Sequence, residues 1–248
     1  MSAPRASETS SSAGRLRLRI ATYNVHSCVG VDGQCDPKRV AEVIQELRAD
    51  VVALQEMTYP ADLAIETRTP FVLPALAEYE CALGPTHVRR QHHFGNVLLS
   101  RFPIRELSRL DLSAHRRREP RGALHVVLDA HGAEFHVFAT HLGLGWGERR
   151  VQVERLVKAV QQLSGGFLAV VGDFNDWLPG RSLVHVLDQR FGSVHAPKSF
   201  PARWPLVALD RVWVQRARVV SVEAHASALA KRASDHLPIV AELEIESR

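Results

Sequence analysis

Short strand-like stretches with polar turns between them dominate this chain and set the limits on its fold. Residues 15–20 alternate arginine with leucine or isoleucine, which is the two-residue period of a half-buried strand. Residues 51–54 and 167–172 are short apolar runs of the kind found in central strands. No apolar run approaches the roughly 20 residues of a membrane-spanning helix. Further strands are predicted at residues 96–100, 123–129, 134–140, 211–214, 218–223 and 239–243, with a hairpin turn at His131 and Gly132.

Two helices are predicted between these strands. Asp36 can cap the first and Pro37 suits its first position, and apolar residues then recur at helical spacing up to Leu47. The second helix is predicted over about residues 148–163, before the glycine pair at 165–166. Many strands, few helices and a hairpin indicate an α+β fold in which two sheets pack face to face with helices outside. A purely parallel, doubly wound sheet fits this order less well.

The composition is that of a globular protein, with 46% hydrophobic and 23% charged residues. One domain is predicted over residues 15–248. Residues 1–14 are small and polar and have no apolar core of a secretory signal, so we expect a disordered leader and a cytoplasmic protein. The net charge of +4 favours an anionic substrate. Three cysteines without a C-x-x-C pair argue against a zinc ribbon or a disulfide framework.

Polar and titratable side chains stand where the predicted strands end or begin. Such positions are those of a site built on the rigid edge of a sheet. Asn24, Glu56, His141, Asp173 and Asn175 follow strands, and Asp210, Asp235 and His236 precede strands.

Each of these residues also has a purely structural interpretation. Asn24 and residues 172–175 could satisfy turns through their side chains. Glu56 could be a solvated strand end, His141 a core imidazole bonded to a backbone carbonyl, and residues 235–238 a capped turn. The order and spacing of the whole set favour the functional interpretation.

Seven motifs in this order resemble the endonuclease/exonuclease/phosphatase superfamily, which includes DNase I, apurinic endonucleases, neutral sphingomyelinases and inositol polyphosphate 5-phosphatases. The resemblance runs from about Arg19 to Ile245 and implies the DNase I-like fold, a four-layer α/β/β/α sandwich of two mixed sheets with outer helices. The motifs are Thr22-Tyr23-Asn24-Val25-His26, Leu54-Gln55-Glu56, the segment 95–104 with Asn96, Thr140-His141-Leu142, Gly172-Asp173-Phe174-Asn175, Leu209-Asp210-Arg211 and Ser234-Asp235-His236.

The resemblance implies a hydrolase that uses a divalent cation, usually Mg²⁺ with Mn²⁺ as an alternative, to cleave phosphate esters. Glu56 would be the main metal carboxylate, Asn24 would lie close to the ion, and Asp235 would be a further ligand. These are oxygen donors, which suit a hard cation. The metal would polarise a phosphoryl oxygen and stabilise charge on the leaving group.

The resemblance also assigns roles around the phosphorus. Asp173 would align or deprotonate the attacking water, and Asn175 would hold a phosphate oxygen. His236 would contact the scissile phosphate, with Asp210 fixing its tautomer and favouring its charged form. His141 would be a second imidazole on the phosphate, as a general acid or an electrostatic donor.

One departure from the family pattern concerns the partner of His141. DNase I-like members carry a supporting carboxylate before the strand of Asn96, but no acidic residue lies between Glu80 and Glu106 here. In the basic segment 115–122, Arg121 is predicted to point its guanidinium at phosphate, and Arg116 and Arg117 are interpreted as solvated charges. Asn96 is predicted to bind substrate together with Arg121.

Three functions follow from these observations. The first is a magnesium-dependent phosphodiesterase or nuclease, and the second a phospholipid, glycolipid or inositol-type head-group phosphoesterase. A lipid enzyme would show an apolar rim beside the site, for which Trp146, Trp177, Leu178 and Trp204 are candidates. The third is a phosphate-binding module without catalysis, which the complete set of acidic and imidazole residues disfavours. No obligate protein partner is inferred.

Overall fold

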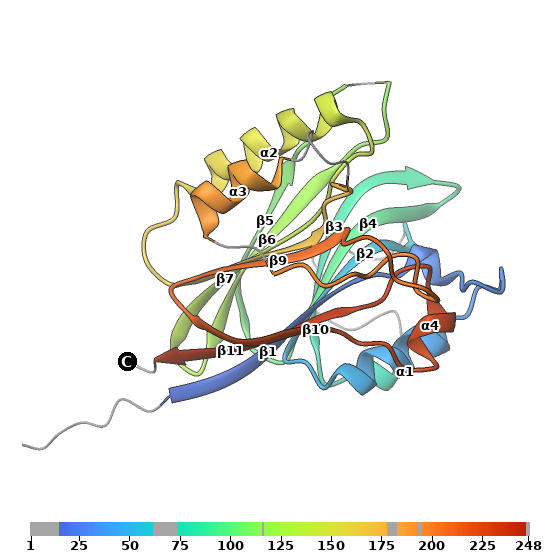
Figure 1. Ribbon diagram of the computed structural model, residues 1–248, viewed down its shortest axis with the longest axis horizontal. Coiled ribbons are helices and arrows are strands. Elements are labelled where there is room, and N and C mark those ends of the chain that lie inside the picture. The colour runs from blue at the N-terminus through green and yellow to red at the C-terminus, as the bar shows by residue number, and fades with distance from the viewer. Residues whose placement is uncertain (1–14, 62–73, 116, 178–182, 193–194, 247–248) are drawn as a thin grey trace, which may run out of the picture.

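The computed structural model describes residues 15–61, 74–115, 117–177, 183–192 and 195–246. Two mixed sheets pack face to face, and helices lie on both outer sides (Figure 1). The predicted α+β sandwich with outer helices is therefore confirmed. The leader proposed for residues 1–14, as well as Arg116 and Leu178, lies outside the described residues. Within the described ranges, no helix combines the length and apolarity needed to cross a bilayer.

The first sheet contains the strands from both ends of the described chain. Within it, β1 and β2 run parallel, and the other neighbours are antiparallel. The helix α1 (Pro37–Leu47) and the short α4 (Ala230–Ala233) pack on its outer face together with the 3-10 turns η1 (His26–Cys28) and η2 (Pro74–Leu76). The strand order is β10 (Arg218–Ala224), β11 (Ile239–Glu246), β1 (Arg15–Asn24), β2 (Val51–Pro60), β4 (His92–Ser100) and β3 (Glu80–Arg89).

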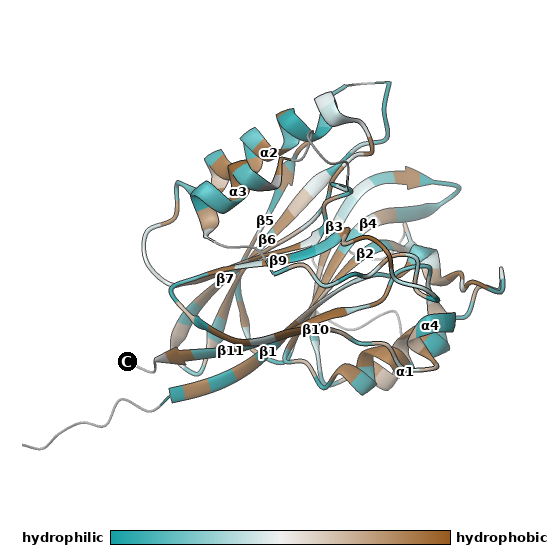
Figure 2. Ribbon diagram, viewed as in Figure 1, coloured by the Kyte–Doolittle hydropathy of each residue, from teal (hydrophilic) through white to brown (hydrophobic). Residues whose placement is uncertain are grey.

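The second sheet is built from the middle of the chain. The helices α2 (Trp146–Val160) and α3 (Val184–Phe191) cover its outer face. Its order is β5 (Ile104–Asp111), β6 (Gly122–Ala130), β7 (Ala133–His141), β8 (Phe167–Asp173) and β9 (Asp210–Gln215), of which only β7 and β8 are parallel neighbours. Apolar side chains fill the space between the sheets and beneath the helices, and the strands carry most of the apolar colour in Figure 2.

Several element boundaries agree with the sequence, and others differ for a physical reason. Asp36 caps α1 by accepting a hydrogen bond from the backbone N–H of Arg39. The predicted second helix begins two residues earlier and ends three residues earlier than expected. The strands β3 and β5 and the helix α3 were not predicted. β3 contains Pro85, which the sheet tolerates because β3 is an edge strand.

Gly172 allows β7 and β8 to approach each other closely beside the site. Its φ of +147° is a conformation that favours glycine, and a Cβ there would lie 1.9 Å from the carbonyl oxygen of Thr140. We expect Gly172→Ala to lower the free energy of unfolding by about 3 kcal/mol or more, because the strands must separate or the backbone must shift. Urea denaturation measures this change.

Gly147 in the first turn of α2 provides the matched control for this substitution. Nothing lies within 4 Å of the Cβ that Gly147→Ala would add, so its unfolding free energy should stay the same or rise slightly. Equal effects of the two alanine substitutions would show that the close approach at Gly172 does not matter.

Candidate active site

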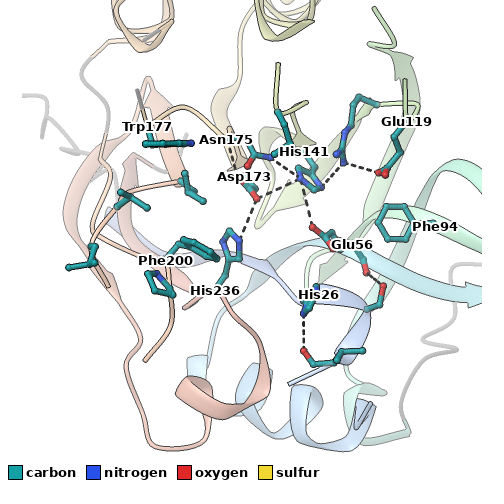
Figure 3. A pocket seen from close by; sticks show the side chains of 18 of the residues that line it. His26, Glu56, Phe94, Glu119, His141, Asp173, Asn175, Trp177, Phe200 and His236 are labelled. Atoms are coloured by element: carbon teal, nitrogen blue, oxygen red, sulfur yellow. Dashed lines mark hydrogen bonds and ion pairs between the residues drawn. The ribbon is translucent and has the colours of Figure 1, made fainter. Parts of the chain in front are cut away.

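The candidate site lies where strand ends of the two sheets meet. His141, Asp173 and Asp210 are registered neighbours on β7, β8 and β9, which places their side chains along one edge of the second sheet. Asn24 ends β1 in the first sheet, beside Gln55 of β2. The two edges face each other across a pocket of about 820 Å³, and Figure 3 shows Glu56, His141, Asp173, Asn175 and His236 pointing toward one another in it.

A β-bulge aims Glu56 at this pocket. Between Leu54 and Met57 the pairing of β2 with β4 shifts by one residue, and Glu56 has a φ of +57°. A bulge turns side chains away from the normal alternation of a strand, and left-handed conformations of non-glycine residues cluster at functional sites. Burial raises the pKa of Glu56, and the nearby Asp173 adds to this, while a hydrogen bond from Asn24 opposes it.

Asn24 connects the two carboxylates of the site. Its Nδ2 donates to Oε1 of Glu56 and to Oδ2 of Asp173, each at 3.0 Å. The remaining oxygen of Asp173 accepts the backbone N–H of Asn175 at 2.9 Å. The two carboxylates accept hydrogen bonds from the same amide group and therefore lie close enough to repel each other. A cation bound between them would relieve this repulsion. The ligand atoms that these two carboxylates offer are oxygens, which suit a hard divalent cation.

Asp235 lies at the edge of this group. Its Oδ1 is 3.8 Å from Nδ1 of His26 and accepts a hydrogen bond from the hydroxyl of Ser234. The same hydroxyl also reaches the backbone oxygen of Asn24. Asp235 is thereby tied to the end of β1, but its side chain is 38% exposed, more than that of the buried Asp173. Its role as a metal ligand stays a prediction.

Asp210 fixes the orientation and charge of His236. Oδ2 of Asp210 lies 2.8 Å from Nδ1 of His236 and accepts the hydroxyl of Ser199 at 2.6 Å. Burial alone would lower the pKa of His236, but the charge of Asp210 and its hydrogen bond, with Asp173 and Asp235, raise that pKa to about 10. Nε2 of His236 then points toward Asp173, 3.8 Å from Oδ2. His236 is therefore a fixed imidazolium at neutral pH.

Asp173, Asp210 and His236 also bring their ligand atoms within 4.8 Å of one another, as a metal site would require. A protonated imidazole has no lone pair for a metal, and the Asp210 oxygen facing His236 already accepts two hydrogen bonds. We therefore interpret Asp210 and His236 as a charge-orienting pair and place the cation-binding potential at Asn24, Glu56 and Asp173.

Arg121 is the partner of His141, for which the sequence offered no carboxylate. Its Nη1 lies 3.0 Å from Nδ1 of His141 and 3.2 Å from Glu119. A guanidinium only donates, so Nδ1 accepts and the ring proton is assigned to Nε2. Burial, which Asp173 opposes, and the charges of Arg121 and His236 lower the pKa of His141 to about 3. His141 is thus a neutral donor, which favours the electrostatic role over that of a general acid.

Nε2 of His141 faces the centre of the site. It lies 3.6 Å from Oδ2 of Asp173 and 3.9 Å from Oε1 of Glu56. Asn175, with a φ of +50°, donates from Nδ2 to the backbone oxygen of Leu142. The same Nδ2 lies 3.1 Å from Nε2 of His141, and because both groups carry protons in this tautomer, the two donors point into the site without a hydrogen bond between them. Asn96 lines a small pocket together with Arg121 and donates to the backbone oxygen of Gly122 at 3.0 Å. Its role in substrate binding stays a prediction.

A buried ionic cluster behind the pocket was missed by the sequence analysis. Arg149 on α2 donates to the backbone oxygens of Gly143 and Leu144, and its guanidinium lies 3.5 Å from Asp176. Arg211 donates to the backbone oxygen of Asp176. The cluster connects the loop after His141 with the loop after Asn175. The sequence did contain a signal for this cluster, because the polar residues Arg149 and Gln152 interrupt the apolar face of α2.

Comparison with known proteins finds relatives that match most of the chain. The YbhP protein of Escherichia coli K12, described as uncharacterised, is 29% identical over an alignment of 253 positions, which covers 93% of this chain and 98% of YbhP. A solved endonuclease/exonuclease/phosphatase from Beutenbergia cavernae superposes with a TM-score of 0.73 at 22% identity, over 93% of this chain and 72% of that one. ANGEL2, described as a 2′,3′-cyclic phosphatase, superposes with a TM-score of 0.70 at 13% identity, over 94% and 96% of the two chains.

These structural similarities establish the DNase I-like fold. The model of the Endonuclease/Exonuclease/phosphatase family matches residues 21–236, a range that contains every predicted site residue. This chain belongs to the endonuclease/exonuclease/phosphatase family.

Proposed function

We propose that this protein is a Mg²⁺-dependent phosphoesterase that hydrolyses a phosphate ester by direct in-line attack of water. Members of its family are hydrolases of phosphate esters, generally with a divalent metal. One observation carries the proposal for this chain: a carboxylate pair on Asn24 stands beside an imidazolium fixed by Asp210. The two carboxylates can bind a cation, and the imidazolium can bind an anion. Hydrolysis of a phosphate ester with a bound metal requires both of these binding sites.

The carboxylate of Glu56 fits a hard divalent cation, with Asn24 close to the ion and Asp235 as a further ligand. Burial and Asp173 raise the pKa of Glu56, which means that the ionised form of this carboxylate lacks a compensating charge. When bound, the ion supplies charge stabilisation to the phosphoryl and leaving oxygens. Glu56 is presented by a bulge and Asp173 by two hydrogen bonds, so the chain holds both carboxylates in place.

The remaining residues act on water and phosphate. Asp173 is positioned to orient the attacking water and accept its proton. His236, as an imidazolium, and the amide of Asn175 stabilise the negative oxygens of the transition state. His141 donates from Nε2, and Arg121 holds it in that tautomer. No activated serine or cysteine is needed, because water is the nucleophile.

The test is a metal-dependent assay with bis(p-nitrophenyl) phosphate as a soluble, generic diester. We expect turnover with Mg²⁺ or Mn²⁺ and none after EDTA treatment, with recovery when Mg²⁺ is restored. A parallel panel of plasmid DNA, abasic oligonucleotide, sphingomyelin and inositol phosphates assigns the natural ester. Binding of phosphate without hydrolysis of any of these with either metal would refute the proposal and favour the non-catalytic binding module.

A further inference from the structure

One wall of the pocket is apolar, opposite a polar wall. The polar wall carries Arg89, Glu119 and Arg121. The ring of Phe200 lies 4.9 Å from the ring of His236, so the apolar wall begins directly beside the catalytic imidazolium. Its members come from the loops after β7 and β8 and from the loop before β9, and include Leu144, Trp177, Phe200, Pro201, Leu206 and Leu209.

Exposed apolar side chains are found next to both walls of the pocket in the sequence. In the described part of the chain, six large apolar side chains are exposed: Val88, Leu144, Trp146, Trp177, Trp204 and Leu206. Three of them line the pocket, and each of the other three lies within two residues of a lining residue. We call these six residues the apolar rim. Exposed apolar residues are normally scattered singly over a surface, so the three that line this pocket, with Trp146 and Trp204 in the segments of Leu144 and Leu206, indicate an interaction site.

The loop that carries Trp204 and Leu206 is fixed to the site. The backbone N–H of Trp204 donates to Pro201 at 3.0 Å, and that of Leu206 donates to Phe200 at 2.8 Å. Ser199, at the base of the loop, bonds through its hydroxyl to Asp210, the partner of His236. Trp204, 79% exposed, is thus held at the tip of a turn whose base touches the catalytic pair.

The chemistry of the rim selects between a lipid and a nucleic acid. Tryptophan can stack on a base, but the exposed aliphatic side chains of Val88, Leu144 and Leu206 offer no stacking face. Aliphatic and indole side chains together suit the boundary between acyl chains and head groups. Exposed Arg89 and Arg203, adjacent to Val88 and Trp204, complement anionic head groups.

We propose that the apolar rim docks on a phospholipid surface, so that the phosphate ester of a lipid head group enters the pocket. This inference rests on the proposed function for the hydrolytic step and adds the substrate class to it. Docking itself needs no catalysis: the apolar rim enters the interfacial region, the arginines meet anionic phosphates, and the pocket opens toward the membrane.

The test is binding to vesicles of equimolar phosphatidylcholine and phosphatidylglycerol, measured in EDTA by co-sedimentation and by tryptophan fluorescence. We expect the wild type to bind with a blue-shifted emission. The double variant Trp146→Ser/Trp204→Ser should bind at least about tenfold more weakly, since two interfacial indoles are lost. Neither tryptophan lines the pocket, so hydrolysis of the soluble diester should remain.

Gln162→Ser, an exposed residue beyond the opposite end of α2 from Leu144, is the control and should bind vesicles like the wild type. Failure of the wild type to bind vesicles, or equal binding by the double variant, would overturn the docking proposal. So would loss of oligonucleotide binding in the double variant with vesicle binding intact. Vesicle binding by an enzyme inert toward every ester would instead refute the proposed function and leave the docking surface standing.

Discussion

Asp173→Asn should lower kcat for the soluble diester by at least about 1,000-fold while the protein remains folded. The carboxylate is almost fully buried, accepts from Asn24 and from the backbone of Asn175, and is placed to take the proton of the attacking water. An amide of the same shape can accept one of these hydrogen bonds but cannot take the proton. Removing a general base and its charge together accounts for a loss of this size.

Single-turnover and steady-state kinetics measure this effect, and urea denaturation checks that the fold is retained. Asp188→Asn is the matched control, because Asp188 accepts a hydrogen bond from the indole of Trp213 away from the pocket. An amide oxygen can keep that bond, so kcat should change by less than about twofold. Residual activity of Asp173→Asn above a few per cent would remove Asp173 from the proton-transfer role.

Asp210→Asn should make the activity fall as the pH rises through the neutral range. In the wild type, His236 keeps its proton up to a pKa of about 10, mainly because of Asp210, so its ionisation does not limit the rate between pH 6 and 9. Without the charge of Asp210, burial is opposed only by Asp173 and Asp235, so the pKa of His236 falls toward neutrality. The active imidazolium is then lost on the alkaline side, and we expect at least about a tenfold larger loss of activity at pH 9 than at pH 6.

The pH profile of kcat for the two proteins measures this difference. His236→Gln is the control, because it removes the imidazolium and leaves no group to titrate at that position. The kcat of His236→Gln should be about 100-fold or more below that of the wild type, and this factor should be the same at pH 6 and pH 9. Parallel pH profiles for the wild type and Asp210→Asn would show that Asp210 does not set the charge of His236.

Local patterns in the sequence predict most of the fold. The alternation in residues 15–20 and the buried run 167–172 correspond to β1 and β8, and Asp36 caps α1 as expected. The strand β3 escaped prediction because Gly84 and Pro85 resemble a turn, and only its edge position makes them acceptable in a strand.

The candidate site, like the fold, could be predicted from the sequence only in part. The sequence shows that polar groups stand at strand ends, and the family resemblance indicates their roles. The bulge that turns Glu56 into the pocket depends on pairing with β4, which local sequence does not specify. Local sequence also does not specify the contact of Arg121, at the start of β6, with His141, at the end of β7. In this chain Arg121 is the partner of His141, and the supporting carboxylate of DNase I-like members is missing from the sequence.

The sequence by itself determined which residue types are available for the chemistry and that they follow short strands, because strand period and turn preference are local properties. The family resemblance implied a charged His236 beside Asp210, but only the tertiary structure places the two in contact and gives His141 the opposite state. His236 faces Asp210 from 26 residues away and stays protonated, whereas His141 is buried against a guanidinium and stays neutral. The two histidines differ because a pKa depends on burial and on neighbouring charge, and both are set by which strands become neighbours.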